Sequence, residues 1–89
     1  MACGPVPRYF FHIVNDNFAS DDKHGFDLPS LEAASLQARK TIGAIIADEL
    51  GQGSSNIPVS VRIRNEAGET VANLTVHTRV VASESPFAD

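Results

Sequence analysis

Hydrophobic and polar residues alternate along three segments, and this predicts three β-strands because successive side chains of a strand point to opposite faces. The first segment, PRYFFHIV at 7–14, is also rich in the aromatic and β-branched residues that favour strands. The second, PVSVRIR at 58–64, has the clearest alternation, and the third is TVANLTVHTRVV at 70–81. The residues NEAGE at 65–69 predict a hairpin connection between the last two strands, with Gly68 where positive φ is favoured.

A fourth segment has the periodicity of a helix. Ser30, after Pro29, is a good N-cap, and Gly51 is a natural left-handed stop, so the predicted helix spans about 31–50. Apolar residues recur there in steps of three and four, which places them in one stripe along the helix. The stripe consists of Leu31, Ala34, Ala38, Ile42, Ile45 and Ile46.

The remaining polar segments predict connections. NDNFASDDKHGFDLP at 15–29 is dense in Asp, Asn, Ser and Gly, which predicts turns, with a short edge strand at Gly25–Leu28 beside the first strand. The pattern therefore predicts a two-layer α+β domain at 7–81. In it, one long helix packs on one face of a three- to four-stranded, mainly antiparallel sheet of order β(β)αββ. Residues 1–6 are predicted to be a flexible N-terminus, and residues 82–89 a disordered tail.

The strand alternation divides side chains between two faces of the sheet. A single helix covers only one face, so the other face meets water or a partner. The predicted inner residues are Tyr9, Phe11, Ile13, Val59, Val61, Ile63, Leu74, Val76 and Val80. The predicted outer residues are Arg8, Phe10, His12, Ser60, Arg62, Arg64, Thr75, His77 and Arg79. Four of the seven Lys and Arg residues thus fall on the outer face, whereas all eleven Asp and Glu residues are expected in loops, the helix and the tail.

The outer face has two interpretations. Outward strand positions must be polar for solubility, and long cationic side chains are a common choice. Alternatively, an exposed Phe10 among cations indicates a docking surface for a protein partner or a second copy of the chain, with Arg62, Arg64 and Arg79 binding carboxylates or phosphates. The candidate partner-binding residues are Arg8, Phe10, His12, Arg62, Arg64, His77 and Arg79. Nucleic acid is the less favoured partner, because the net charge of −4 opposes extensive phosphate contacts.

No residue pattern predicts catalysis, a cofactor, a metal or a small-molecule ligand. His12 and His77 share the predicted outer face, but zinc needs three or four ligands and no Cys or carboxylate is expected there. Cys3 is the only cysteine, so an internal disulfide is excluded. No apolar run approaches the about 20 residues that span a bilayer, and no secretory signal pattern begins the chain, so a cytoplasmic protein is expected.

Three motifs occur in the order found in a known family. These are PRYFFHIV, then D…GFDLPSLEAASLQA, then NEAGETV between two strands. Over about residues 7–76 the chain resembles a family of short bacterial proteins known only as a domain of unknown function. The resemblance implies a small α+β domain in a bacterial cytoplasm and transfers no catalytic residue.

The segment DLPSLEAA is also similar to the helix start in the partial ribonuclease-H-like domain of antitoxins. The chain lacks the Gly-Cys that follows Leu-Pro in that pattern, and it lacks an appended set of DNA-binding helices. An antitoxin-like module that docks phosphates is therefore kept as the alternative function.

Overall fold

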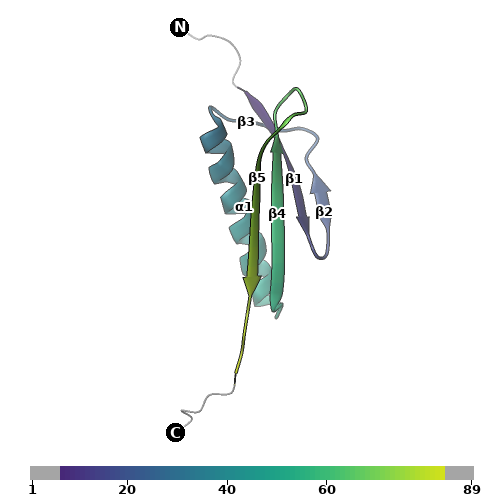
Figure 1. The fold of residues 1–89 in the computed structure, drawn as a ribbon, viewed down its shortest axis with the longest axis vertical. Helices are drawn as coiled ribbons and strands as arrows, with labels where there is room; N and C mark the ends of the chain where they lie inside the picture. The colour runs from purple at the N-terminus through teal and green to yellow at the C-terminus, as the bar shows by residue number, and fades with distance from the viewer. Residues whose placement is uncertain (1–6, 84–89) are drawn as a thin grey trace.

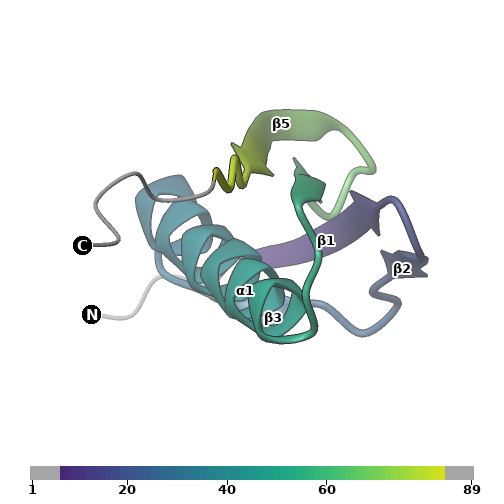
Figure 2. The same ribbon diagram turned by 90° about the horizontal axis from the view of Figure 1, so that it is seen from below.

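The computed structural model describes residues 7–83, which form two layers (Figure 1). In chain order the elements are β1 (Arg8–Asn15), β2 (Ala19–Asp21), β3 (Phe26–Asp27), α1 (Leu31–Gly51), β4 (Asn56–Arg64) and β5 (Thr70–Arg79). Helix α1 lies on one side of the sheet only (Figure 2). The predicted α+β class and the single helix between two groups of strands are confirmed, but the sheet has five strands and not three or four. The predicted flexible segment 1–6 and residues 84–89 of the predicted tail lie outside the described residues.

The sheet is antiparallel throughout and has β4 near its centre. The strand order is β2-β1-β4-β5, and β3 pairs with the start of β1. The register places His12 of β1 opposite Arg62 of β4, and Arg62 in turn opposite Asn73 of β5. Strand β3 lies inside the predicted edge segment 25–28, whereas β2 was not predicted. The three residues of β2 are all exposed, so no hydrophobic alternation marks them as a strand.

The core lies between α1 and the inner face of the sheet. Nine apolar residues are buried there: Tyr9, Phe11, Ala34, Ala38, Ile42, Ile57, Val59, Val61 and Ile63. The four residues from β4 are almost completely inaccessible, because β4 has a strand on both sides and the helix above it. Phe26 of β3 adds an edge-to-face contact with Phe11, with ring centroids 5.5 Å apart.

Three residues predicted for the core are instead partly exposed. Leu31 is the first residue of α1, Val76 lies on the edge strand β5, and Val80 follows the end of β5. Each lies at a border of the two-layer stack, where periodicity gives the correct face but no second layer covers the side chain.

Both ends of α1 lie within one residue of the predicted span of about 31–50, but the glycine with positive φ after the helix is not the predicted one. Ser30 is the N-cap, and its Oγ accepts a hydrogen bond from the Ala33 N–H at 3.1 Å. Gly51 is still helical, and the residue with positive φ is Gly53, at +97°. The N–H of Ser54 then donates to the carbonyl of Glu49, which closes the last turn.

The C-terminal end of α1 is tied to the β1–β2 hairpin by one carboxylate. Glu49 accepts hydrogen bonds from Ser54 Oγ at 2.8 Å, Asn17 Nδ2 at 3.3 Å and Asn15 Nδ2 at 3.5 Å. The Asn15 Oδ1 accepts from the backbone N–H groups of Asn17 and Phe18, which fixes the turn itself. This cluster connects three segments that are distant in sequence.

Among residues 7–83, no helix is long and apolar enough to cross a membrane.

Candidate functional site

The face of the sheet opposite α1, called the outer face below, carries all seven predicted partner-binding residues. On β1, Arg8, Phe10 and His12 alternate with the buried Tyr9 and Phe11. The register then places Arg62 and Arg64 of β4, and His77 and Arg79 of β5, on the same side of the sheet. The predicted division of side chains between the two faces is therefore correct for these residues.

The Arg8 end of the outer face is covered by the segment that follows β2. Gly25 lies against Arg8 and Phe10, with so little space that a Cβ atom there would be 2.7 Å from Arg8 Cγ and 2.9 Å from Phe10 Cε2. Phe10 is consequently half-buried, not exposed as the alternation predicts. The prediction of Phe10 as a free apolar anchor is corrected by this contact.

Arg8 is held in place by the same segment. Its Nε donates to Asp27 Oδ1 at 2.9 Å, and its Nη1 donates to the carbonyl oxygen of His24 at 3.2 Å. The hydrogen bond and the charge of Asp27 raise the pKa of the Arg8 guanidinium further above its ordinary value, so Arg8 keeps its positive charge at neutral pH. Arg8 is thus occupied within the chain.

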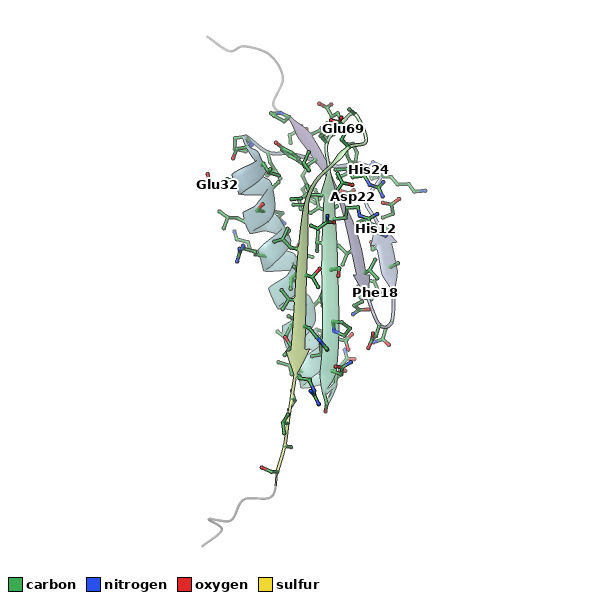
Figure 3. The ribbon with its side chains drawn as sticks, in the orientation of Figure 1. His12, Phe18, Asp22, His24, Glu32 and Glu69 are labelled. Carbon is green, nitrogen blue, oxygen red and sulfur yellow. The ribbon has the colours of Figure 1, made fainter. Side chains whose placement is uncertain are left out.

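Carboxylates are present on the outer face, contrary to the prediction that they fall only in loops, the helix and the tail. Asp21 of β2 is opposite His12 in the register, and its Oδ1 is 3.4 Å from His12 Nδ1. Asp27 of β3 forms an ion pair with Arg8, with Arg8 Nε 2.9 Å from Asp27 Oδ1. Figure 3 shows His12, Asp22 and His24 together on the β1–β2 side of the sheet, whereas Glu32 lies on the helix. The acidic residues therefore border one end of the outer face.

Arg64 lies at this border and not in the open part of the face. It lines a hollow of about 240 Å³ together with residues of both charges: Asp21, Asp22, Lys23 and Glu66. Asp22 Oδ1 accepts from the backbone N–H groups of His24 and Gly25, which is the geometry of an Asx turn and not of a calcium loop. Asp22 Oδ2 is buried and has no hydrogen-bond partner among the described residues.

The remaining part of the outer face is open and carries free cations. Arg62 and Arg79 are exposed, and neither forms an ion pair within residues 7–83. His77 Nε2 is 2.6 Å from Asn56 Oδ1, and Ser60 Oγ is 3.3 Å from Thr75 Oγ1. We call Ser60, Arg62, Thr75, His77 and Arg79 the open face. It is a polar surface with two unneutralised guanidinium groups.

The predicted site residues form neither a metal-binding cluster nor a large pocket. In the part of the chain that the structure describes, no group of three or more His, Cys, Asp or Glu residues could hold a metal ion. The hollow beside His12 and Arg62 has a volume of only about 60 Å³, well below the 300–1,000 Å³ typical of small-molecule sites. The hydroxyl of Ser60 pairs with Thr75 and not with a histidine.

Comparison with known proteins identifies the family. A family model described as a domain of unknown function (DUF6894) matches residues 8–77. The chain belongs to this family. The match begins at β1 and ends two residues before the end of β5, so the DUF6894 unit includes both layers and the outer face. No curated protein and no solved structure matches the chain.

The DUF6894 match confirms the resemblance that the sequence motifs indicated. The residues that sequence reasoning missed are Asp21, Gly25 and Asp27, which close one end of the outer face. The sequence does contain a signal for the turn that positions them, because Asp22 is followed three residues later by Gly25, a spacing typical of a tight turn. The sequence does not show over which side of the sheet such a turn folds.

Proposed function

We propose that this domain is a non-enzymatic docking module that binds an acidic segment of a partner protein at the open face. The observation that carries the proposal is the pair of exposed guanidinium groups, Arg62 and Arg79, which have no ion-pair partner within residues 7–83. Guanidinium groups bind carboxylates with two parallel hydrogen bonds, which gives both affinity and orientation.

The polar neighbours of Arg62 and Arg79 support a peptide partner. Ser60, Thr75 and His77 provide hydroxyl and imidazole groups on a flat surface between the two arginines. Arg79 lies six residues along β5 from Asn73, the residue opposite Arg62, so an extended acidic peptide that runs along the strands for about 20 Å can reach both cations. The hollow beside Ser60, Arg62 and Thr75 has a volume of only about 60 Å³, which favours a peptide over an enclosed small molecule.

Nucleic acid is the alternative partner, and two observations disfavour it. Single-stranded nucleic acid binding combines phosphate contacts with bases stacked on aromatic rings. Phe10 is the aromatic residue of the predicted binding set, and Gly25 packs against its ring. The chain also carries a net charge of −4, which repels a long polyanion.

A binding experiment with defined probes tests the proposal. The probes are a fluorescein-labelled peptide of alternating Glu and Ser residues and a labelled single-stranded oligonucleotide of equal charge, and fluorescence anisotropy at low salt measures the binding of each. We expect Arg62→Glu to weaken peptide binding by about tenfold or more, because one charge-assisted hydrogen bond is worth about 1.5–3 kcal/mol.

The matched control is Lys40→Glu, which makes the same change in net charge at an exposed residue of α1. Loss of peptide binding in Arg62→Glu but not in Lys40→Glu supports a site on the open face. Equal loss in both variants would indicate non-specific attraction and contradict the proposal. Tighter binding of the oligonucleotide than of the peptide would favour the alternative function.

A further inference from the structure

Strand β5 is a long edge strand, and within residues 7–83 it pairs with another strand on one side only. It has ten residues and lies at the end of the order β2-β1-β4-β5. The N–H of Val80 donates to the carbonyl of Ser55 at 2.8 Å, so Val80 and Ser55 form a pair of the hydrogen-bonded kind. Hydrogen-bonded and non-hydrogen-bonded pairs alternate along an antiparallel ladder, so every second residue before Val80 is also in a hydrogen-bonded pair. The backbone N–H and C=O groups of Leu74, Val76 and Thr78 therefore point to β4. The backbone groups of Asn73, Thr75, His77 and Arg79 therefore point to the free edge.

Most of the usual devices that protect an edge strand are absent from residues 73–79 of β5. Natural edges are blocked by proline, by lysine, by bulges or by charged residues that point inward. Residues 73–79 contain no proline, lysine or carboxylate, and Arg79 at the end of the strand points to the outer face. The register skips Val71 between Ala72 and Thr70, so the bulge in the β4–β5 ladder is on β5 but precedes this stretch. The backbone of 73–79 is thus available to a further strand.

Exposed apolar side chains accompany this edge. The inner side of β5 and the chain after it expose Val76, Val80 and Val81. A groove of about 440 Å³ separates β5 from α1 and is lined by Arg39, Ile42, Gly43, Leu74, Thr75 and Val76. Leu36 and Leu50 lie seven residues before and after Gly43, so they flank it on the same side of the helix, and both are exposed. Five of the nine exposed large apolar side chains among residues 7–83 therefore lie on β5, on the chain directly after it, or on the side of α1 that carries Gly43.

We propose that the occupant of this edge is a second copy of the chain, whose β5 pairs antiparallel with β5 about a two-fold axis at Val76. In this register Asn73 is opposite Arg79 of the second copy and Thr75 is opposite His77, so no two like charges meet. Shifting the axis to His77 would place the two His77 side chains opposite each other. On the inner face Val76 meets its own copy, and Leu74 meets Thr78. The edge is self-complementary in hydrogen bonding, in charge and in apolar contact, which a two-fold interface requires.

The position of α1 fits the same axis. The helix packs on β4 and β5, so its axis lies near the boundary between these strands. Strands are spaced about 4.8 Å apart, which puts the helices of two paired copies about 10 Å apart, at the upper limit of helix packing distances. Gly43 lies at the level of Val76 and has no atom within 4 Å of its Cβ position, so the second helix can approach there. Leu36 then faces Leu50 of the second copy.

Disulfide cross-linking tests the register. In a Cys3→Ser background, Val76→Cys places two thiols at a non-hydrogen-bonded pair on the axis. The Cα atoms there are about 4.5 Å apart, within the range of a disulfide. We expect mild oxidation to convert the Val76→Cys chain to a covalent dimer of twice 9.5 kDa. Thr78→Cys should not cross-link, because in this register Thr78 is opposite Leu74 of the second copy. The two introduced thiols would then be four residues apart along the strands, or about 13 Å.

Val14→Cys is the control for exposure. Val14 lies on the outer face of β1 and is 39% exposed, against 38% for Val76. Equal cross-linking of Val14→Cys and Val76→Cys would show random collision between thiols and overturn the proposal. Cross-linking of Thr78→Cys in preference to Val76→Cys would also overturn it, because the register would be wrong.

Sedimentation of the unmodified chain and of two variants tests the interface without cysteines. Thr75→Pro removes an N–H that points to the free edge and leaves the β4–β5 ladder intact. Gly43→Glu adds a charge in open space within one copy but at the contact between two helices. We expect the parent chain to sediment as a dimer and both variants as monomers with unchanged far-UV circular dichroism.

Three outcomes of the sedimentation would overturn the proposal. A parent chain that is monomeric at about 1 mM lacks even a weak interface. A dimer that persists in both variants uses another surface. A dimer lost in Arg62→Glu but kept in Gly43→Glu would place self-association on the open face.

Discussion

Gly25 lies against the ring of Phe10, and its backbone has φ of +78°. This contact folds the segment after β2 across the Arg8 end of the outer face. It explains why Phe10 is half-buried and why the open face begins only at Ser60 and Arg62. Glycine is required at this position for two reasons. The backbone is left-handed, and a Cβ atom would overlap with Arg8 and Phe10.

Replacing Gly25 with alanine should therefore lower the free energy of unfolding by more than the cost of the left-handed backbone alone. The matched control is Gly53→Ala, because Gly53 has φ of +97° but no atom within 4 Å of its Cβ position. We expect Gly53→Ala to cost about 1–2 kcal/mol for the left-handed conformation, and Gly25→Ala to cost about 1–3 kcal/mol more for the steric overlap. Urea denaturation measures both values. Equal losses would show that the turn moves away from Phe10 without penalty.

Glu49 should stabilise the end of the helix through its hydrogen bonds and not through its charge. A carboxylate near the C-terminal end of a helix is disfavoured by the helix dipole, yet Glu49 accepts bonds from Ser54 and Asn17 there. We expect Glu49→Ala to lower the free energy of unfolding by about 1–2 kcal/mol. Glu49→Gln retains an acceptor for Ser54 and removes the unfavourable charge, so we expect little change. A loss as large in Glu49→Gln as in Glu49→Ala would contradict the hydrogen-bond explanation.

Ile63 should be among the most sensitive positions in the core. Its side chain is inaccessible to solvent and lies on the central strand β4 beneath α1. We expect Ile63→Ala to cost about 2–5 kcal/mol, from lost burial and from the cavity left behind. The control is Val14→Ala on the exposed side of β1, which should change stability by less than about 1 kcal/mol. Thermal unfolding compares the two variants, and similar losses would place Ile63 outside the core.

Any binding of nucleic acid should depend only weakly on salt. The slope of log affinity against log salt is about −0.7 for each phosphate neutralised on a single strand. Arg62 and Arg79 are the free cations of the open face, so we expect a slope no steeper than about −1.5. Filter retention of a labelled single-stranded oligonucleotide over a range of salt concentrations measures the slope. A steeper slope that falls in the double variant Arg62→Ala/Arg64→Ala would contradict the docking proposal and favour the alternative function.

Local patterns were sufficient to predict the main elements. The alternation of Val59, Val61 and Ile63 against Ser60, Arg62 and Arg64 fixed both the strand and its two faces, because a strand has a period of two. Ser30 fixed the start of α1 through its side-chain hydrogen bond. The local pattern did not determine which glycine follows the end of α1 with positive φ, because Gly51 and Gly53 are both suitable and only Gly53 adopts that conformation.

The sequence by itself determined the two layers, the order of the main elements along the chain and the side of the sheet on which each arginine lies, because these follow from periodicities of two and of about 3.6 along the chain. The tertiary structure alone decided which arginines are free. Arg8 is neutralised by Asp27, nineteen residues away, Arg64 lies among the acids of the β2–β3 segment, and Arg62 and Arg79 remain open. Contacts of this kind depend on how a turn folds back over a sheet, and no local periodicity encodes that path.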